Sequence, residues 1–128
     1  MIKSILLVYA FVFSLSSFAQ RTILDDVGAA MKAGSSKELI KYCNANLEIK
    51  LNGKTANYSI AQAEVVLKDF FLKNPSRGFE YVHRGSSEGG LQYTIGTYSL
   101  QEGSYRVVMV LKKVKDQILI DTINLSRE

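Results

Sequence analysis

The chain has 128 residues, a formal net charge of +4, one cysteine and one histidine. Its length suits one domain, and so small and scattered a positive charge excludes the clustered basic stripe of a nucleic-acid-binding protein. A single cysteine cannot form an internal disulfide, so the fold has to be stabilised by packing. A single histidine excludes a multi-histidine metal site, and we expect neither a metal nor a cofactor.

The first twenty residues have the anatomy of a secretory signal peptide. One lysine precedes an apolar run over residues 5–15, and small residues follow as far as Ala19. The run is too short for a membrane-spanning helix. We therefore expect residues 1–19 to be a signal peptide cleaved after Ala19, and residues 20–128 to form one periplasmic or secreted domain. No lipid anchor is expected, because the residue after the cleavage site is Gln20 and not cysteine.

Three helices are expected in the first half of this domain. Apolar residues recur at helical spacing over residues 23–31, and Gly34 ends the helix. Two capping-box patterns, Ser35–Glu38 and Ser59–Gln62, then predict the starts of a short second helix and a longer third one. In each box the serine hydroxyl accepts a hydrogen bond from the backbone amide three residues later. The side chain of that later residue reaches back to the backbone amide of the serine. The Asn74–Pro75 pair ends the third helix.

Strands dominate the rest of the chain. Alternating apolar residues over 47–51 predict one strand, closed by the turn signal Asn52–Gly53. Four more strands are predicted over residues 79–84, 91–100, 105–114 and 117–125. The short connections between the last three predict an antiparallel meander. The fold class is therefore α+β, with N-terminal helices packed in and against a curved antiparallel sheet.

Side-chain alternation sorts these strands into two faces if Lys115–Asp116 is a two-residue turn. The expected core contacts between the third helix and the inner face join Val66, Phe70, Ile95, Met109 and Leu111. The outer face is half apolar, which favours a homodimer interface. Its candidate residues are Tyr98, Arg106, Val108, Val110, Asp121, Ile123 and Leu125. A slip of one residue at a turn would exchange the faces of a strand.

Several short stretches carry a resemblance to known proteins. They are Asp69-Phe70-Phe71 with Asn74-Pro75, Phe79, His83-Arg84-Gly85-Ser86, Tyr93 to Tyr98, and Gly103 to Val107. With this order of elements, the chain resembles the nuclear-transport-factor-2-like superfamily, and within it a family of small secreted bacterial domains without assigned function. The resemblance covers residues 20–128. It implies a cone whose open end binds small molecules or catalyses in some relatives, and dimerisation through the outer sheet face.

The sequence leaves more than one function open. Our leading interpretation is a non-enzymatic module that binds a small amphipathic ligand or a protein. An isomerase- or hydratase-like enzyme is the first alternative, with Tyr81, His83 and Tyr93 lining the cone. Isomerase chemistry needs a carboxylate beside hydrogen-bond donors, and neither Glu80 nor Asp121 pairs with a tyrosine in the predicted pattern. The second alternative is a protease-inhibitor-like module, because cystatins also wrap a sheet around a helix.

Two further features are interpreted structurally. Cys43 lies near the end of a short helix, where a cysteine is usually a small buried hydrophobe. No local signature supports a Cys43–His83 catalytic pair. The glycine-rich stretch 85–90 lacks the lysine and hydroxyl residue of a phosphate loop, and a strand follows it, so we interpret it as a strand connector.

Overall fold

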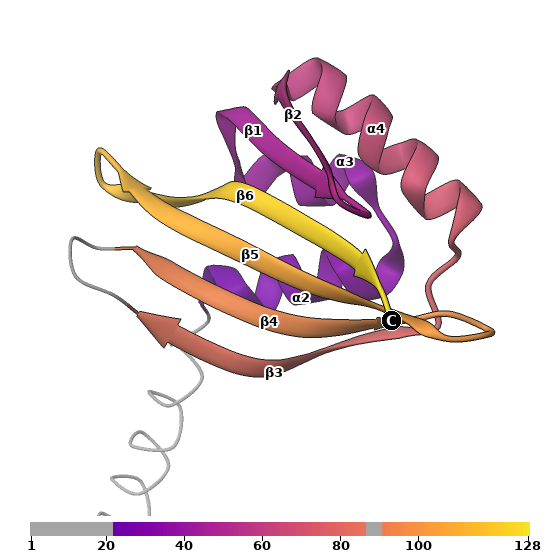
Figure 1. The fold of residues 1–128 in the computed structure, drawn as a ribbon. Helices are drawn as coiled ribbons and strands as arrows, with labels where there is room; N and C mark the ends of the chain where they lie inside the picture. The colour runs from indigo at the N-terminus through magenta and orange to yellow at the C-terminus, as the bar shows by residue number, and fades with distance from the viewer. Residues whose placement is uncertain (1–21, 87–90) are drawn as a thin grey trace, which may run out of the picture.

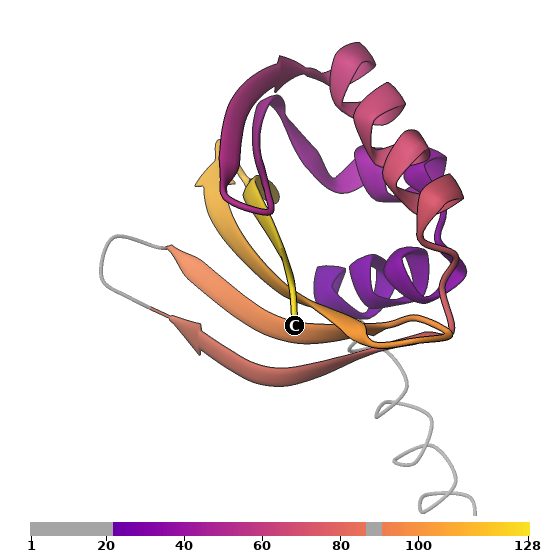
Figure 2. The same cartoon turned by 45° about the vertical axis from the view of Figure 1, so that its right-hand side comes forward.

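The computed structural model describes residues 22–86 and 91–128, and all of its helices lie on the concave side of one curved sheet (Figures 1 and 2). The helices are α2 (Ile23–Ala33), α3 (Ser36–Leu39), the 3₁₀ helix η2 (Ile40–Tyr42) and α4 (Ile60–Lys73). None of the helices in these two ranges has the length and apolar content needed to cross a bilayer. The expected signal peptide and most of the glycine-rich connector lie outside the described residues.

Six strands form the sheet, in the order β2-β1-β6-β5-β4-β3. Their bounds are β1 Cys43–Leu51, β2 Lys54–Ser59, β3 Gly78–Ser86, β4 Gln92–Ser99, β5 Ser104–Val114 and β6 Gln117–Arg127. Strands β1 and β6 are parallel, and every other pair of neighbours is antiparallel. Strand β2 is not predicted from the sequence, because its Lys-Thr-Ala-Asn-Tyr-Ser run is too polar to give an alternating pattern.

The helix ends follow the predicted caps, with one difference. Gly34 ends α2 in the left-handed conformation at φ 64°, and its N–H donates to the Met31 carbonyl. The box at Ser59 is complete, because Ser59 and Gln62 exchange two hydrogen bonds of 3.3 and 3.4 Å.

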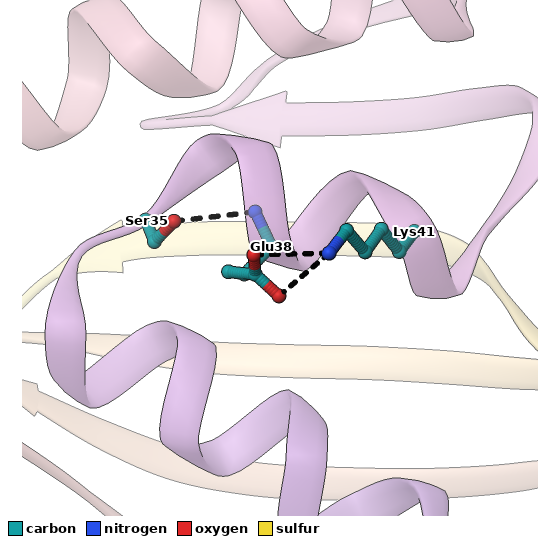
Figure 3. A network of polar contacts seen from close by, with 3 residues as sticks. All are labelled: Ser35, Glu38 and Lys41. Carbon is teal, nitrogen blue, oxygen red and sulfur yellow. Dashed lines mark hydrogen bonds and ion pairs between the residues drawn. The ribbon is translucent and has the colours of Figure 1, made fainter.

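The box at Ser35 is only half formed (Figure 3). The Glu38 amide donates to Ser35 Oγ at 3.2 Å, as predicted. The Glu38 carboxylate, however, accepts from Lys41 Nζ at 3.0 Å instead of reaching back to the N-cap amide. A cation one turn ahead therefore competes successfully with the backbone for this carboxylate.

The core lies between the concave sheet face and the helices, and its aromatic part is centred on α4. The Phe70 ring is 5.0 Å from the Tyr105 ring and 5.7 Å from the Tyr98 ring, measured between centroids. Phe70, Met109 and Leu111 are buried, as predicted. Val66 is half-buried and packs at the edge of this core. The prediction that Ile95 belongs to the core is wrong, because the register of β4 differs from the expected one.

The pairing of β4 with β5 is shifted by one residue from the predicted pairing. Tyr98 lies opposite Tyr105, whereas we expected it opposite Arg106. The reason is the turn, where the Leu100 N–H donates to the Gly103 carbonyl and so closes the hairpin one residue early. Because side chains alternate, the shift exchanges both faces of β4. Ile95 therefore points outward, and Tyr98 points into the core.

A second difference arises between β5 and β6. The predicted two-residue turn is present, with Val114 opposite Gln117 and Leu111 opposite Ile120. Beyond Ile120 the register shifts by one residue, because Asp121 is an extra residue in a β-bulge. Ile123 and Leu125 consequently face the core and are buried. Tyr98, Ile123 and Leu125 are thus wrong as candidates for an exposed interface.

Candidate functional site

The three residues expected to line the cone do not share a face. A bulge at Val82 shifts the β3–β4 register, so that Tyr81 lies opposite Gly96 and His83 lies opposite Ile95. Simple alternation places Tyr81 and His83 together, whereas the bulge turns them to opposite faces. The candidate site of Tyr81, His83 and Tyr93 is therefore not assembled inside the cone.

Tyr81 connects β3 to α2 on the inner face. Its hydroxyl donates to the Leu24 carbonyl at 2.8 Å, and the Arg84 guanidinium lies 4.7 Å from its ring centroid. The ring also lies against Gly28, where a Cβ would come within 3.1 Å of it. Burial raises the pKa of Tyr81 to about 12, so the hydroxyl stays protonated. These contacts support a structural role for Tyr81, in which it holds the helix on the sheet.

His83 and Tyr93 meet on the outer face. His83 Nε2 lies 3.2 Å from the Tyr93 hydroxyl, and both side chains are exposed. The Tyr93 ring covers Gly85 on the neighbouring strand, where any side chain would collide with it. The pair therefore covers a glycine in the sheet, and it faces solvent instead of an enclosed cavity.

The interior of the cone is largely filled by aromatic rings. Phe70 and Phe71 from α4 meet Tyr98 and Tyr105 from the sheet, with ring centroids 5.0 to 5.8 Å apart. A pocket of about 210 Å³ lies between α4 and the β1–β2 hairpin. Ligand pockets of roughly 300–1,000 Å³ are usual for drug-sized molecules, so this pocket is small.

The two strand carboxylates considered for acid–base chemistry are far apart. Glu80 is on β3 and Asp121 is on β6, with two strands between them, which separates the strands by about 14 Å at ordinary strand spacing. Asp121 accepts a hydrogen bond from the Asn44 amide at 3.3 Å. Among the described residues, no group of three histidine, cysteine or acidic side chains could hold a metal ion.

Cys43 is a structural residue. It is buried, and its Sγ lies 3.4 Å from the Leu39 carbonyl, which accepts the thiol proton. Burial raises the pKa of this thiol to about 12, so it is protonated and a weak nucleophile at neutral pH. His83 is exposed on β3, four positions away from β1 in the sheet. The two residues cannot form a catalytic pair.

The outer face of the sheet is the broadest candidate surface. No helix of the described residues lies on it (Figures 1 and 2). Two cross-strand pairs, Tyr93 with Val110 and Ile95 with Val108, bring four apolar side chains together at its centre. We call these four residues the outer block. Tyr93 is 36% exposed, and the other three are half-buried by their neighbours.

Mostly polar residues surround the outer block, together with the exposed Val82 of the β3 bulge, which lines a pocket with Ile95. On one side, the pairing continues from Val110 through Thr122 to Glu48, and from Val108 through Asn124 to Lys50. On the other side, His83 lies opposite Ile95. Of the predicted interface residues, Arg106, Val108 and Val110 do lie on this face, and Asp121 lies in the bulge beside it. Ile95 and Tyr93 are members of this surface that the sequence pattern did not predict, because the predicted register places their side chains on the inner face.

A larger pocket lies at one end of the sheet, and we call it the end pocket. It has a volume of about 570 Å³ and combines the end of α4 with the β4–β5 turn and the end of β6. Its lining residues are Lys73, Asn74, Pro75, Arg77, Leu100, Gln101, Glu102 and Arg127. No short sequence motif predicts it, because these residues come from three separate segments.

Comparison with known proteins places the chain among domains that have the same fold. A family model described as "Domain of unknown function (DUF4783)" matches residues 24–126. A DUF4783 protein from Bacteroides ovatus is 34% identical, with a TM-score of 0.77, and the match covers 80% of this chain and 93% of that one. One from Bacteroides fragilis is 25% identical, with a TM-score of 0.77 and coverages of 85% and 100%. A search of curated proteins gives no match.

More distant structures support the fold alone. The protein Rd1NTF2_04 with long sheet is 18% identical, with a TM-score of 0.62 and coverages of 80% and 95%. A Nostoc punctiforme domain with a cystatin-like fold is 11% identical, with a TM-score of 0.60 and coverages of 81% and 72%. These neighbours confirm the expected nuclear-transport-factor-2-like, α+β architecture. The family match and the Bacteroides relatives together show that the chain belongs to the DUF4783 family, a family of domains of unknown function.

Proposed function

We propose that this domain is an exported, non-enzymatic binding module that forms a homodimer through its outer sheet face. The observation that carries the proposal is the outer block of four apolar side chains on a sheet face without a helix over it. On a soluble domain, a contiguous apolar patch of this kind usually marks a partner surface.

The shape of the surface suits a second copy of the same chain. The cross-strand rows that contain the outer block run over five strands, from Glu48 and Lys50 on β1 to Gly85 and His83 on β3. At ordinary strand spacing, five strands span about 19 Å. Because the helices occupy the concave side of the sheet, this face is convex, and a two-fold operation would bring the apolar centres of two copies together and leave the polar edges in water. Because only four apolar side chains form the centre, we expect a dissociation constant on the order of micromolar.

The interior of the domain favours binding over catalysis. Aromatic rings fill most of the cone, and the groups with burial-raised pKa values are held by backbone carbonyls. Glu80 and Asp121 lie on strands about 14 Å apart, so they cannot act on one substrate atom. The sheet surface is therefore the better candidate for function.

Sedimentation velocity tests the dimer. Val108→Asp places two like charges near the two-fold axis and should dissociate the dimer, because each charge would lose its water in the interface. Val65→Asp is the matched control, since Val65 is 67% exposed on α4 and lies on a helix away from the outer face. We expect Val108→Asp to be monomeric and folded by circular dichroism, and Val65→Asp to dimerise like the unchanged protein. A monomer at tens of micromolar for the unchanged protein would refute the proposal.

The proposed export rests on the sequence of the first twenty residues. Intact-mass measurement of protein expressed in a secreting Gram-negative host should give a chain that begins at Gln20. A bulky residue in place of Ala19 should block this processing, because signal peptidase accepts only small residues there. Recovery of the uncleaved chain from the cytoplasm would contradict export without affecting the proposed dimer.

A further inference from the structure

We propose that the end pocket binds a small oxyanion, such as the carboxylate or phosphate group of a small solute. Its volume of about 570 Å³ is within the usual range of ligand sites. Three of its lining side chains, Lys73, Arg77 and Arg127, are cationic, and only Glu102 is acidic. The pocket contains none of the outer-block residues, so this inference is independent of the proposed dimer.

Arg127 is held in place before any ligand arrives. Its Nη2 donates to the Glu102 carbonyl at 2.6 Å, and its guanidinium carbon lies 5.7 Å from the Tyr105 ring centroid. Its backbone N–H donates to Asn52 Oδ1 at 2.9 Å. A guanidinium has five N–H donors, so the single bond to Glu102 leaves others for a ligand. A fixed guanidinium binds an oxyanion with less loss of side-chain entropy than a free one.

Gly103 makes the position of this guanidinium possible. The glycine has a φ of 94°, and a Cβ at this position would lie 2.8 Å from Arg127 Nη2. The turn between β4 and β5 therefore combines a left-handed backbone conformation with close approach of a cationic side chain. Both requirements favour glycine.

Two carbonyl groups at and just after the end of α4 are hydrogen-bonded within the protein, which weakens their repulsion of an anion. The C-terminal carbonyls of a helix carry partial negative charge, which normally disfavours anions nearby. Here the Asn74 amide groups donate twice to the Phe70 carbonyl, at 2.9 and 3.0 Å. The Tyr98 hydroxyl in turn donates to the Asn74 carbonyl at 2.5 Å. Two carbonyl acceptors are thus satisfied from within the protein.

The other two cations lie on well-defined backbone. The Arg77 N–H donates to the Ser99 carbonyl at 2.8 Å, which joins the segment after α4 to the end of β4. Lys73 Nζ lies 3.0 Å from Asp69 Oδ2, but this pair is exposed and therefore weak. An incoming oxyanion can compete for the lysine while it binds the two arginines. A planar carboxylate or a phosphate suits this arrangement, because both accept bidentate bonds from arginine.

Amide chemical-shift titration of the purified protein tests the site. Inorganic phosphate and citrate are added separately, with sodium chloride adjusted to constant ionic strength. We expect saturable shifts at Arg77, Gln101 and Arg127. Arg77→Gln and Arg127→Gln should each weaken binding about tenfold or more, the loss expected for a charge-assisted hydrogen bond. Lys113→Gln is the matched control, because it removes one charge from an exposed strand residue outside the pocket and should leave binding unchanged.

The possible results of the titration either support the oxyanion site or refute it. Saturation by phosphate alone, by citrate alone or by both supports the site and assigns its preferred oxyanion. The site would be refuted by the absence of shifts, by shifts that sodium chloride reproduces, or by an unchanged affinity for phosphate and citrate in Arg77→Gln. Thermal melts identify any variant that has lost its fold. If Arg127→Gln fails to fold, Arg77→Gln still tests the site, because the hydrogen bond from Arg77 to Ser99 comes from its backbone and is kept in the variant.

Discussion

Replacing Phe70 with alanine tests the packing of the aromatic interior. Phe70 is 3% exposed, and its ring lies 5.0 to 5.7 Å from those of Phe71, Tyr98 and Tyr105. Phe→Ala in a core costs about 3–5 kcal/mol, a range that includes the loss of aromatic contacts. Because three aromatic rings surround Phe70, we expect a loss in the upper part of this range, about 4–5 kcal/mol in the free energy of unfolding. For a domain of this size, that loss lowers the Tm by roughly 15–20 °C.

Urea denaturation followed by far-ultraviolet circular dichroism measures this loss. The m value should stay unchanged, because the variant exposes nearly the same surface on unfolding. Leu72→Ala is the matched control on the same helix, since Leu72 is 71% exposed and its truncation should cost less than about 0.5 kcal/mol. A cost below about 1.5 kcal/mol for Phe70→Ala would mean that its ring does not pack between α4 and the sheet, and the reasoning would be refuted.

Two more substitutions test buried groups on the inner face. Thr94 is 1% exposed, and its Oγ1 is a buried polar atom without a hydrogen-bond partner among the described residues. The isosteric Thr94→Val should therefore raise the free energy of unfolding by about 1 kcal/mol, whereas Thr94→Ser, which keeps the hydroxyl, should lower it. A lower free energy of unfolding for Thr94→Val in urea titrations would contradict this expectation. Burial raises the pKa of Cys43 from 9.0 to about 12 in the folded state, so its contribution to stability is complete below about pH 9 and is lost as the pH rises toward 12. Cys43→Ala should reduce the fall in stability between these pH values. Part of the fall should remain, because burial also raises the pKa of Tyr81 to about 12. An unchanged pH profile of the free energy of unfolding would argue against a buried thiol.

Sequence patterns were sufficient to predict the features of the fold that depend on residues close together in the sequence. The ends of α2 and α4 follow from a glycine and a capping box, because both act within one helical turn. The faces of β4 and of the end of β6 were not predictable, because they depend on a one-residue choice at the Leu100–Gly103 turn and on the bulge at Asp121. The alternation of apolar and polar residues cannot detect either the turn or the bulge, since one inserted residue exchanges the two faces of the strand for all residues that follow it.

The two candidate sites were not predicted from the sequence for a similar reason. The outer block depends on the β4 register, so half of it was assigned to the wrong face. The end pocket depends on tertiary contacts, such as the bond from Arg127 to Glu102 across 25 residues. Single-sequence patterns record neighbours within one element, and neither site is contained in one element.

The parallel pairing of β1 with β6 has a consequence for the folding order. Strand β6 lies between β1 and β5, so it alone joins the β1–β2 hairpin to the three-strand group β5-β4-β3. The two halves of the sheet therefore remain unconnected until residues 117–127 have been synthesised. Contacts this distant in sequence slow folding, because a long loop has to close before they form. A nascent chain of this protein is thus expected to stay open and accessible to chaperones until synthesis is almost complete.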